Sequence, residues 1–343
     1  MNVNASNRRI IFARWPAGYP VPEDFKTLVE PLPRPGPGQV LLKTLDLSLD
    51  PYMRGRMIDA PSYVPPMAIG DTMCGQVVAK VVESRDAAVA AGDLVLATTG
   101  WQEYAVATPG ELTKLDPAMP HRSYALGVLG MPGLTAYAAL LDIGKPQPGE
   151  TVVVTAATGA VGSVVGQIAK IKGCRAVGIA GGAEKCRYAV EALGYDACVD
   201  HQSPNFPALL AAACPQGIDV YFESVAGACL EAALPLLNLH ARVPLIGFSA
   251  YYNLSSLPVG VNQVPALLRQ ILVNRISLTG FLFLDHTAAR QAEFLRDMRV
   301  WLGSGKVRYR EDILNGLDRA PQGLIGMLRG DNFGKLIVKV ADE

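Results

Sequence analysis

The chain has 343 residues, of which 50% are hydrophobic and 18% are charged, and its formal net charge at pH 7 is zero. This composition is typical of a globular protein with one to three domains, and the zero net charge gives it no general attraction for nucleic acid or an anionic membrane. The sequence has no run of about 18 apolar residues and no apolar stretch near its start that would act as a signal peptide. We therefore expect a cytoplasmic protein without a nucleic-acid or membrane partner.

The cysteines and histidines show no metal-binding pattern. None of the six cysteines forms a C-x-x-C pair, and the four histidines are scattered along the chain. Both observations make a zinc site improbable, and they are typical of small apolar cysteines in a reducing compartment. The sequence predicts no metal site.

The first third of the chain is predicted to be a compact, largely antiparallel β barrel. It is rich in proline and glycine, with short strand-like runs at residues 40–47, 75–82 and 94–97. Glycine turns at residues 36–38 and 92–93 separate these runs, as in a small all-β domain. Near Gly127 the pattern changes, because residues 134–141 have helical periodicity.

From residue 151 onward, strand and helix patterns alternate. Six strands with intervening helices predict a doubly wound parallel sheet. We expect one more strand, at residues 335–340, to return to the first domain. The predicted domains are 1–127 (substrate domain, first part), 128–306 (nucleotide-binding domain) and 307–343 (return to the substrate domain). The expected strands are 151–155, 175–179, 197–200, 218–223, 243–248 and 276–284, and the expected helices are 163–172, 184–193, 206–213, 228–237, 264–273 and 288–302.

The stretch AATGAVG, residues 156–162, lies between the first of these strands and its helix. A strand, a glycine turn and a helix in this order present backbone N–H groups and the positive end of a helix dipole to a phosphate. An isolated glycine pattern serves helix packing or a tight turn as often as it binds a dinucleotide. Here it lies inside a complete β-α-β unit, which favours dinucleotide binding.

The residues after the second strand bear on the choice of cofactor. An NAD-binding unit usually has Asp or Glu here to hold the ribose 2′-OH. This chain has Ala180, Gly181 and Gly182, which leave room for a 2′-phosphate that Lys185 and Arg187 would neutralise. These residues favour NADPH. Two alternatives stay open: Glu184 would favour NAD if it faced the ribose, and Lys185 and Arg187 would be unrelated to the cofactor if they only formed a solvated helix face.

Five stretches now suggest a family: SLDPYMRGRM (48–57), GMPGLTAY (130–137), AATGAVGSVVGQIAK (156–170), GFSAYYNL (247–254) and NFGK (332–335). They resemble the zinc-independent medium-chain dehydrogenases/reductases, in the branch of prostaglandin (leukotriene) reductases, plant double-bond reductases and bacterial curcumin reductases. The resemblance implies an α/β protein with a doubly wound parallel (Rossmann) sheet and a mainly β, barrel-like (GroES-like) substrate domain. It also implies NADPH-dependent reduction of the C=C bond of α,β-unsaturated ketones or aldehydes.

The resemblance implies roles for particular residues. Lys185 matches the family's 2′-phosphate lysine, and Asn332 matches a further cofactor contact. Thr135 and Phe281 fall where the family approaches the nicotinamide, and Met131 is expected to border the substrate. The pyrophosphate turn is matched by Gly159, Ala160, Val161 and Gly162.

Two positions differ from the family pattern. His201 stands where many relatives have Tyr near the 2′-phosphate, and its charge varies near neutral pH. Ser224 begins SVAG (224–227), where relatives have NVGG, and a hydroxyl replaces only part of the hydrogen bonding of an amide. We expect both differences to affect cofactor affinity rather than cofactor identity.

The resemblance also bears on zinc. Zinc-dependent relatives carry Gly-His-Glu and a four-cysteine lobe, whereas this chain reads GDTMCG at residues 70–75. The pattern disfavours zinc-assisted alcohol oxidation.

Reduction of an enone needs a hydrogen-bond donor for the carbonyl oxygen that becomes enolate-like, and a tyrosine O–H meets this need at neutral pH. Tyr252 follows the fifth strand at its carboxyl end, where doubly wound sheets bind ligands. It aligns with the catalytic tyrosine proposed for plant relatives. We assign Tyr252 as carbonyl donor and acid, and Tyr52, from the other domain, as second donor or substrate-orienting group. Tyr251 stays an alternative to Tyr252, and each tyrosine could instead be a half-buried aromatic with a satisfied hydroxyl.

Two other functions stay open: an NADPH quinone reductase of the same superfamily, and a non-catalytic NADPH-binding sensor. The family often forms homodimers through the edge of the sixth strand, and the apolar run at residues 276–284 is typical of such an edge. Substrate size is expected to depend on the loops at residues 58–67 and 253–263.

Overall fold

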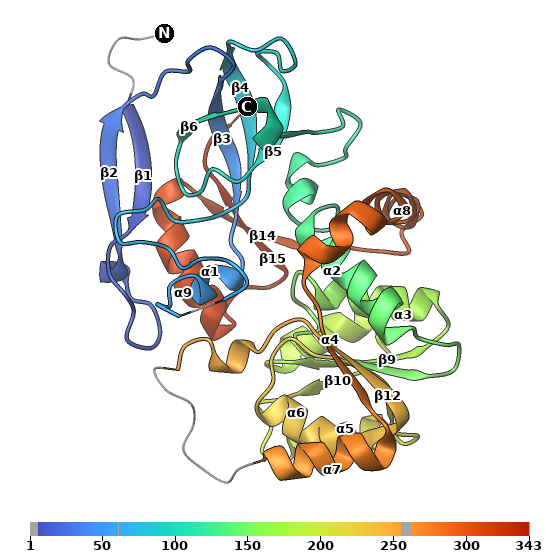
Figure 1. Ribbon diagram of the computed structural model, residues 1–343. Coiled ribbons are helices and arrows are strands. Elements are labelled where there is room, and N and C mark those ends of the chain that lie inside the picture. Colours follow the sequence, from blue (N-terminus) through green and yellow to red (C-terminus); the bar gives the residue numbers. More distant parts are fainter. Residues whose placement is uncertain (1–5, 61, 255–262, 343) are drawn as a thin grey trace. The chain divides into compact units, whose positions relative to one another are not determined.

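The computed structural model describes residues 6–60, 62–254 and 263–342 (Figure 1). Their contacts divide the chain into two compact units. Unit 1 contains the described residues of 1–127, 253–255 and 311–343, and unit 2 contains those of 128–252 and 256–310. Within the described residues, no helix is both long enough and apolar enough to cross a membrane.

Unit 2 is built on a six-stranded parallel sheet in the order β10-β9-β8-β11-β12-β13. Counted along the chain this is the order 3-2-1-4-5-6 of a Rossmann fold, so the predicted doubly wound sheet is confirmed. Its strands are β8 (Thr151–Val154), β9 (Arg175–Ala180), β10 (Ala197–Asp200), β11 (Ile218–Phe222), β12 (Leu237–Leu245) and β13 (Ser277–Gly280).

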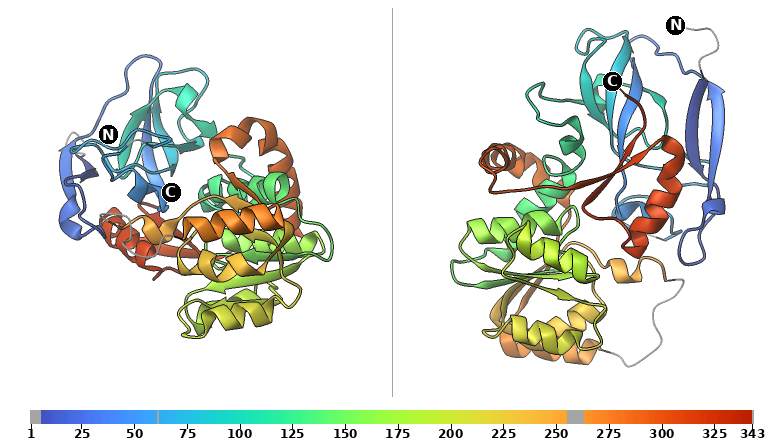
Figure 2. Two further views of the ribbon diagram at one scale, coloured as in Figure 1. Left: turned by 60° about the horizontal axis from the view of Figure 1, so that its bottom comes forward. Right: turned by 180° about the vertical axis from the view of Figure 1, so that it is seen from behind.

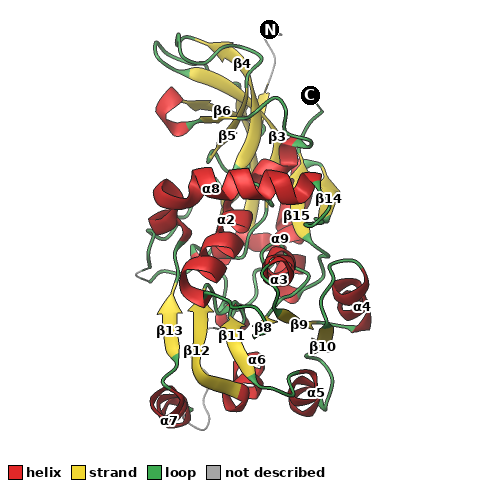
Figure 3. Ribbon diagram, turned by 90° about the vertical axis from the view of Figure 1, so that its right-hand side faces the viewer, coloured by secondary structure: helices red, strands yellow, loops and turns green. Residues whose placement is uncertain are grey.

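Helices cover both faces of this sheet. Helices α2 and α3 lie on one face and α5, α6 and α7 on the other (Figures 1 and 2), while α8 crosses α2 (Figure 3). The helices of unit 2 are α2 (Met131–Ala138), α3 (Gly162–Ile171), α4 (Ala183–Glu191), α5 (Phe206–Ala213), α6 (Ala228–Ala233), α7 (Val264–Asn274) and α8 (Phe283–Gly303). Because both faces are covered, β8 is buried along its whole length, as its valine run predicts.

Unit 1 contains a mainly antiparallel seven-stranded sheet and a separate hairpin. The sheet has the order β14-β15-β3-β4-β5-β7, with β6 also paired to β3. The hairpin joins β1 (Ser6–Phe12) to β2 (Phe25–Pro31). The sheet strands are β3 (Val40–Ser48), β4 (Val77–Ser84), β5 (Leu94–Ala97), β6 (Tyr104–Ala107), β7 (Thr113–Lys114), β14 (Glu311–Asn315) and β15 (Lys335–Lys339), and the helices are α1 (Tyr52–Gly55) and α9 (Ala320–Arg329).

The predicted return of the C-terminal strand to the first domain is confirmed, because β15 pairs antiparallel with β3. The core of unit 1 collects side chains from both ends of the chain, including Phe12, Trp101 and Leu336. Strand β14, helix α9 and the β1–β2 hairpin were not among the predicted elements. Strands β1 and β14 are short and partly exposed, so their apolar pattern is weak. Helix α9 is amphipathic, with Leu324 and Ile325 on its buried side.

The predicted boundaries were wrong around the fifth and sixth strands of the parallel sheet. The strand expected at residues 243–248 begins at Leu237 and ends at Leu245, and the preceding helix ends at Ala233, next to a short turn that contains Pro235. A proline within a helix lacks the N–H needed to continue it. The strand expected at 276–284 ends at Gly280, and Phe283 begins α8. A short apolar run does not distinguish a strand from a buried helical turn.

Candidate functional site

The glycine turn leads from β8 into the first turn of α3. Among the described residues, the backbone N–H groups of Ala160, Val161 and Gly162 have no backbone acceptor, whereas Gly159 N–H donates to the Ala156 carbonyl at 2.8 Å. These three amides lie at the positive end of the α3 dipole. The local arrangement fits a pyrophosphate, because it offers unused donors at a helix N-terminus.

Gly166 sets how closely α3 packs on Tyr195. A Cβ added to Gly166 would lie 2.0 Å from the ring of Tyr195, so only glycine allows this contact. The Tyr195 hydroxyl donates to the Gly162 carbonyl at 2.7 Å and is completely buried with it. Tyr195 therefore holds the first turn of α3 in place beneath the predicted phosphate turn.

The turn between β9 and α4 lies beside His201. A Cβ on Gly181 would be 3.1 Å from the His201 Nε2 atom, so the imidazole borders this turn. Asp200 closes the turn from the other side, since its Oδ1 accepts the N–H of Gly182 at 2.8 Å and that of Gln202 at 2.9 Å. The hydrogen bond from Gly182 lowers the pKa of Asp200. Its carboxylate is thus occupied by the backbone next to the predicted 2′-phosphate site.

The charged residues of α4 take distinct places. Glu184 and Arg187 are exposed, and Lys185 is half-buried. Glu184 lies in the first turn of α4, where a negative charge complements the helix dipole. This position accounts for Glu184 without a contact to a ribose.

The turn after β11 brings together Ser224 and two residues not singled out from the sequence. Ser224 Oγ lies 3.0 Å from Thr155 Oγ1, which also accepts the Ser224 N–H at 2.9 Å. Glu223 is fully buried, and its Oε1 accepts the N–H groups of Val225 at 2.7 Å and Ala226 at 2.8 Å. Burial raises the pKa of Glu223, and these two N–H groups oppose that rise. Glu223 therefore shapes the turn that carries Ser224.

Ala226 has φ = 65°, in the left-handed region that favours glycine. The family pattern has glycine at this position, so the replacement adds local backbone strain. The hydrogen bond from Ala226 N–H to Glu223 Oε1 helps to hold this conformation.

The Tyr252 hydroxyl lies at the carboxyl end of the parallel sheet. A Cβ added to Gly247 would be 3.0 Å from the Tyr252 hydroxyl and 3.2 Å from the Ser224 carbonyl oxygen. Both atoms lie close to the position that a side chain on Gly247 would occupy, so a larger residue here would crowd them. The Tyr252 ring also packs edge-on against Phe248, with centroids 5.2 Å apart. The Tyr252 hydroxyl therefore lies near the turn that carries Ser224, at the carboxyl end of β12.

Tyr251 points elsewhere. Its hydroxyl is 3.9 Å from the Cβ position of Gly227, at the start of α6. The two adjacent tyrosines therefore place their hydroxyls in different surroundings.

Met131 and Thr135 share one face of α2. They are one helical turn apart and partly exposed, whereas the other six residues of the helix are buried. Phe281, directly after β13, stacks on His286 with ring centroids 4.6 Å apart. Its N–H donates to the Leu245 carbonyl at 2.9 Å, which holds it beside the end of β12.

Tyr52 begins α1 in unit 1. Burial raises its pKa strongly, and the nearby Cys74 and Asp50 raise it further. The phenol therefore stays protonated and able to donate a hydrogen bond at physiological pH.

Asn332 and Lys335 belong to the NFGK stretch of unit 1. The Asn332 side-chain amide donates to the Gly334 carbonyl at 2.8 Å, which closes a tight turn before β15. Lys335 is 1% exposed and donates to Ser48 Oγ at 2.6 Å and to the Leu49 carbonyl at 2.8 Å. It also pairs with Asp50. Lys335 therefore joins NFGK to the residues that precede Tyr52.

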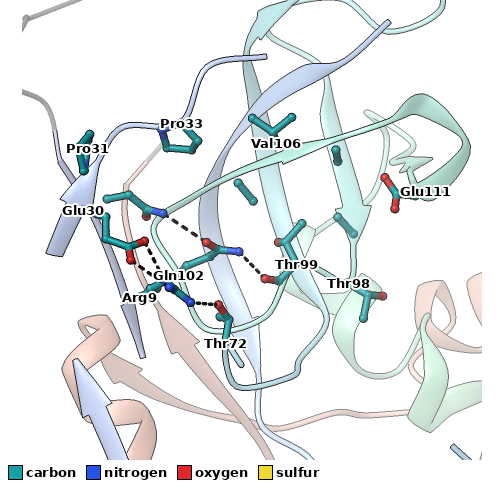
Figure 4. Close-up of a pocket in the computed structure, with 14 residues that line it drawn as sticks. Arg9, Glu30, Pro31, Pro33, Thr72, Thr98, Thr99, Gln102, Val106 and Glu111 are labelled. Atoms are coloured by element: carbon teal, nitrogen blue, oxygen red, sulfur yellow. Dashed lines mark hydrogen bonds and ion pairs between the residues drawn. The ribbon is translucent and has the colours of Figure 1, made fainter. Parts of the chain in front are cut away.

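A cavity of about 670 Å³ in unit 1 lies between the β1–β2 hairpin and the ends of β5 and β6 (Figure 4). Several of its polar side chains form hydrogen bonds to one another or to the backbone. The Arg9 guanidinium binds Glu30 at 2.8 and 3.0 Å and Thr72 at 3.1 Å, and Gln102 bonds to the Thr99 carbonyl. These pairs hold the hairpin to the sheet. None of the predicted site residues lines this cavity.

The described residues contain no group of three or more His, Cys, Asp or Glu side chains placed to hold a metal ion. Residue 61 and residues 255–262 lie outside the described residues, so the two loops proposed to set substrate size are described only in part.

Comparison with known proteins identifies the family. A family model described as N-terminal domain of oxidoreductase matches residues 8–115, and one described as zinc-binding dehydrogenase matches residues 160–297. The NADPH-dependent curcumin reductase of Escherichia coli (strain K12) is 52% identical over 98% of this chain and 98% of its own length. The 2-alkenal reductase (NADP(+)-dependent) of Nicotiana tabacum is 40% identical, with 100% of both chains covered. The chain belongs to the zinc-independent medium-chain dehydrogenases/reductases.

A solved structure agrees with this family. The structure of CurA from Vibrio vulnificus in complex with NADPH has a TM-score of 0.95 and 49% sequence identity, and the match covers 98% of this chain and 100% of that one. The family pattern did not point to Asp200 or Glu223. The sequence could have pointed to both residues in one way, because each is acidic and stands at the carboxyl end of a predicted strand. Ligands bind at this end of the strands in this fold.

Proposed function

We propose that this protein reduces the C=C bond of α,β-unsaturated ketones and aldehydes with NADPH as cofactor. Full-length similarity to the NADPH-dependent curcumin reductase, at 52% identity, is the observation that carries the proposal. The relative named as a 2-alkenal reductase supports the same substrate class. Its enzyme class is therefore a zinc-independent double-bond oxidoreductase.

The residues present fit NADPH. The unused amides of Ala160, Val161 and Gly162 suit the pyrophosphate, and Gly159 shapes the turn that presents them. Small residues after β9, with Lys185, Arg187 and His201 around them, suit a 2′-phosphate. We assign Ser224, Thr135, Phe281 and Asn332 as further cofactor contacts. NADPH supplies a hydride for the β-carbon of the substrate.

The protein's own contribution is to stabilise negative charge on the substrate oxygen. We assign Tyr252 as the hydrogen-bond donor to that oxygen and as the acid that supplies a proton. Its hydroxyl lies at the carboxyl end of the sheet, beside the turn that carries Ser224. Tyr52 is the second donor or orients the substrate, and its raised pKa keeps its O–H protonated. Met131 and Tyr251 are assigned to the substrate contact surface.

The test is NADPH oxidation, followed by absorbance at 340 nm, with a 2-alkenal, an enone such as 3-nonen-2-one, curcumin and a quinone, each repeated with NADH. We expect fast turnover of the enones with NADPH. Turnover of the quinone alone would show that the protein is a quinone reductase instead. Tight NADPH binding without any turnover would instead support a sensor.

The role of Tyr252 is tested by Tyr252→Phe. Loss of a donor to a developing oxyanion is expected to lower kcat for an enone by about tenfold or more, which corresponds to about 1.4 kcal/mol. Tyr251→Phe separates the two adjacent tyrosines, because the Tyr251 hydroxyl lies near Gly227 instead. A loss of kcat in Tyr251→Phe and not in Tyr252→Phe would exchange their roles. An unchanged rate in Tyr252→Phe, with NADPH still bound, would remove Tyr252 from the mechanism.

We also propose a homodimer. Strand β13 forms an edge of the parallel sheet, and its four residues are exposed. On α7, Leu268 and Leu272 are one turn apart and 59% and 77% exposed. An open strand edge beside an apolar helix face would be an aggregation risk in a monomer, and a second copy of the chain would cover both.

We also propose a cytoplasmic location, because all six cysteines are free thiols, as is typical of a reducing compartment.

A further inference from the structure

Arg54 is a buried cation without a hydrogen-bonded carboxylate in the described part of the chain. It lies on α1 and is 2% exposed, one of the largest fully buried side chains. Its guanidinium donates to three oxygen atoms: Asn253 Oδ1 at 3.1 Å, the Gly18 carbonyl at 2.8 Å and the Met57 carbonyl at 3.4 Å. All three acceptors are neutral, and burial lowers the pKa of Arg54.

The acidic group whose charge acts on Arg54 already has other partners. Asp24 is 1% exposed and acts on Arg54 only through its charge. Its Oδ1 accepts from Arg14 Nε at 2.8 Å and its Oδ2 accepts from the Val21 N–H at 2.9 Å. A buried charge with neutral partners is costly, and an apolar side chain of similar size would serve packing better. Apolar packing therefore gives no reason for arginine at this position, and the reason must lie in its hydrogen bonds.

Asn253 links this cation to the proposed catalytic tyrosine. Asn253 is 8% exposed and directly follows Tyr252 in the chain. Its side chain accepts from Arg54, and its backbone carbonyl oxygen lies 3.5 Å from the Cβ position of Gly18. The Asn253 side chain is thus held by Arg54, and its backbone carbonyl lies beside Gly18, whose own carbonyl also accepts from Arg54. Tyr252 is joined directly to this residue in the chain.

We propose that Arg54 is a positioning residue for Tyr252, acting through its hydrogen bond to Asn253. A hydroxyl that stabilises a developing charge must be held within a fraction of an ångström, because a misplaced donor loses most of its effect. Arg54 supplies this restraint from α1 with a planar donor group that keeps its charge. The proposal rests on the role of Tyr252 under the proposed function.

The experiment compares Arg54→Lys, Asn253→Ala and the double variant. Each single change is expected to lower kcat for an enone by about tenfold, with the KM for NADPH changed less than about twofold. The double variant is expected to lose no more than either single variant, because both remove the same restraint. Asn253→Asp keeps an acceptor for Arg54 and is expected to retain kcat. Multiplied losses in the double variant, or the same loss in Asn253→Asp, would overturn the proposal.

Two controls separate positioning from general damage. Arg14→Lys weakens the neighbouring ion pair with Asp24 and leaves Asn253 in place, so kcat is expected to stay near the wild-type value even if Tm falls. In a Tyr252→Phe background, Arg54→Lys is expected to cause no further loss of kcat. A further tenfold loss in that background would show that Arg54 acts elsewhere. Full activity of Tyr252→Phe itself would instead refute the tyrosine mechanism.

Discussion

Lys335 Nζ lies 2.6 Å from Asp50 Oδ1, and the side chains of this pair are 1% and 6% exposed. The two residues are 285 positions apart in sequence. Ser48 completes the group, since its hydroxyl bonds to Asp50 and accepts from Lys335. The pair joins β15 to the end of β3, directly before the helix that carries Tyr52. Two of the motifs that marked the family are therefore parts of one buried ionic group.

Lys335→Met is expected to destabilise unit 1 strongly, because it leaves the Asp50 carboxylate buried without its cation. The loss in the free energy of unfolding is expected to be about 3–5 kcal/mol. Urea unfolding measures it, and the double variant Asp50→Leu/Lys335→Met is expected to recover part of the loss. Lys339→Met is the control, because that lysine is 40% exposed. Equal losses in Lys335→Met and Lys339→Met would contradict this account.

Lys185→Ala is expected to discriminate between the two nicotinamide cofactors. A charged hydrogen bond to a phosphate contributes about 1.5–3 kcal/mol, so the KM for NADPH should rise about tenfold or more. The KM for NADH should change little, because NADH lacks the 2′-phosphate. Lys172→Ala, at the exposed end of α3, is the matched control. A similar rise for both cofactors would count against the 2′-phosphate role.

Glu223 is expected to make stability depend on pH. Burial raises its pKa above the ordinary value of 4.5, so the folded chain binds this proton more tightly than the unfolded chain does. The stabilisation is fully present below the ordinary value and is lost as pH rises through the raised one. Tm measured at intervals from pH 4 to pH 8 should therefore fall with pH more steeply in wild type than in Glu223→Gln. Glu231→Gln, on the exposed side of α6, should keep the wild-type slope, and a wild-type slope in Glu223→Gln would exclude this role.

Leu272→Glu is expected to convert a dimer to a monomer. The change places a charge in the middle of the apolar face of α7, where a second copy would have to desolvate it. Light scattering at micromolar concentration measures the mass. Val300→Glu is the control, because Val300 is also exposed but lies on α8. A monomeric wild type would refute the dimer itself.

Local pattern was sufficient for most of the parallel sheet. The valine run of β8, the glycine turn after it and the spacing of Val165, Ile168 and Ala169 in α3 all act over a few residues, and the structure confirms them. The prediction of element boundaries failed where a short apolar run fits both a strand and a buried helical turn. The apolar run from residue 281 predicts the end of a strand, but in the structure it leads into α8. The buried residues of this helix are Phe294 and Met298.

The sequence by itself determined the fold class and the strand, glycine turn and helix of β8 and α3, because these depend on near neighbours in the chain. Only the tertiary structure decided what surrounds Arg54, Glu223 and Lys335. Each of these charged residues is buried, and its contacts come from segments distant in sequence or from a turn that exists only in the folded chain. A charged residue is expected on the surface when only the sequence is known, because most charged side chains are exposed in folded proteins. Its burial, and the partners that make burial tolerable, arise only when distant segments exclude water together.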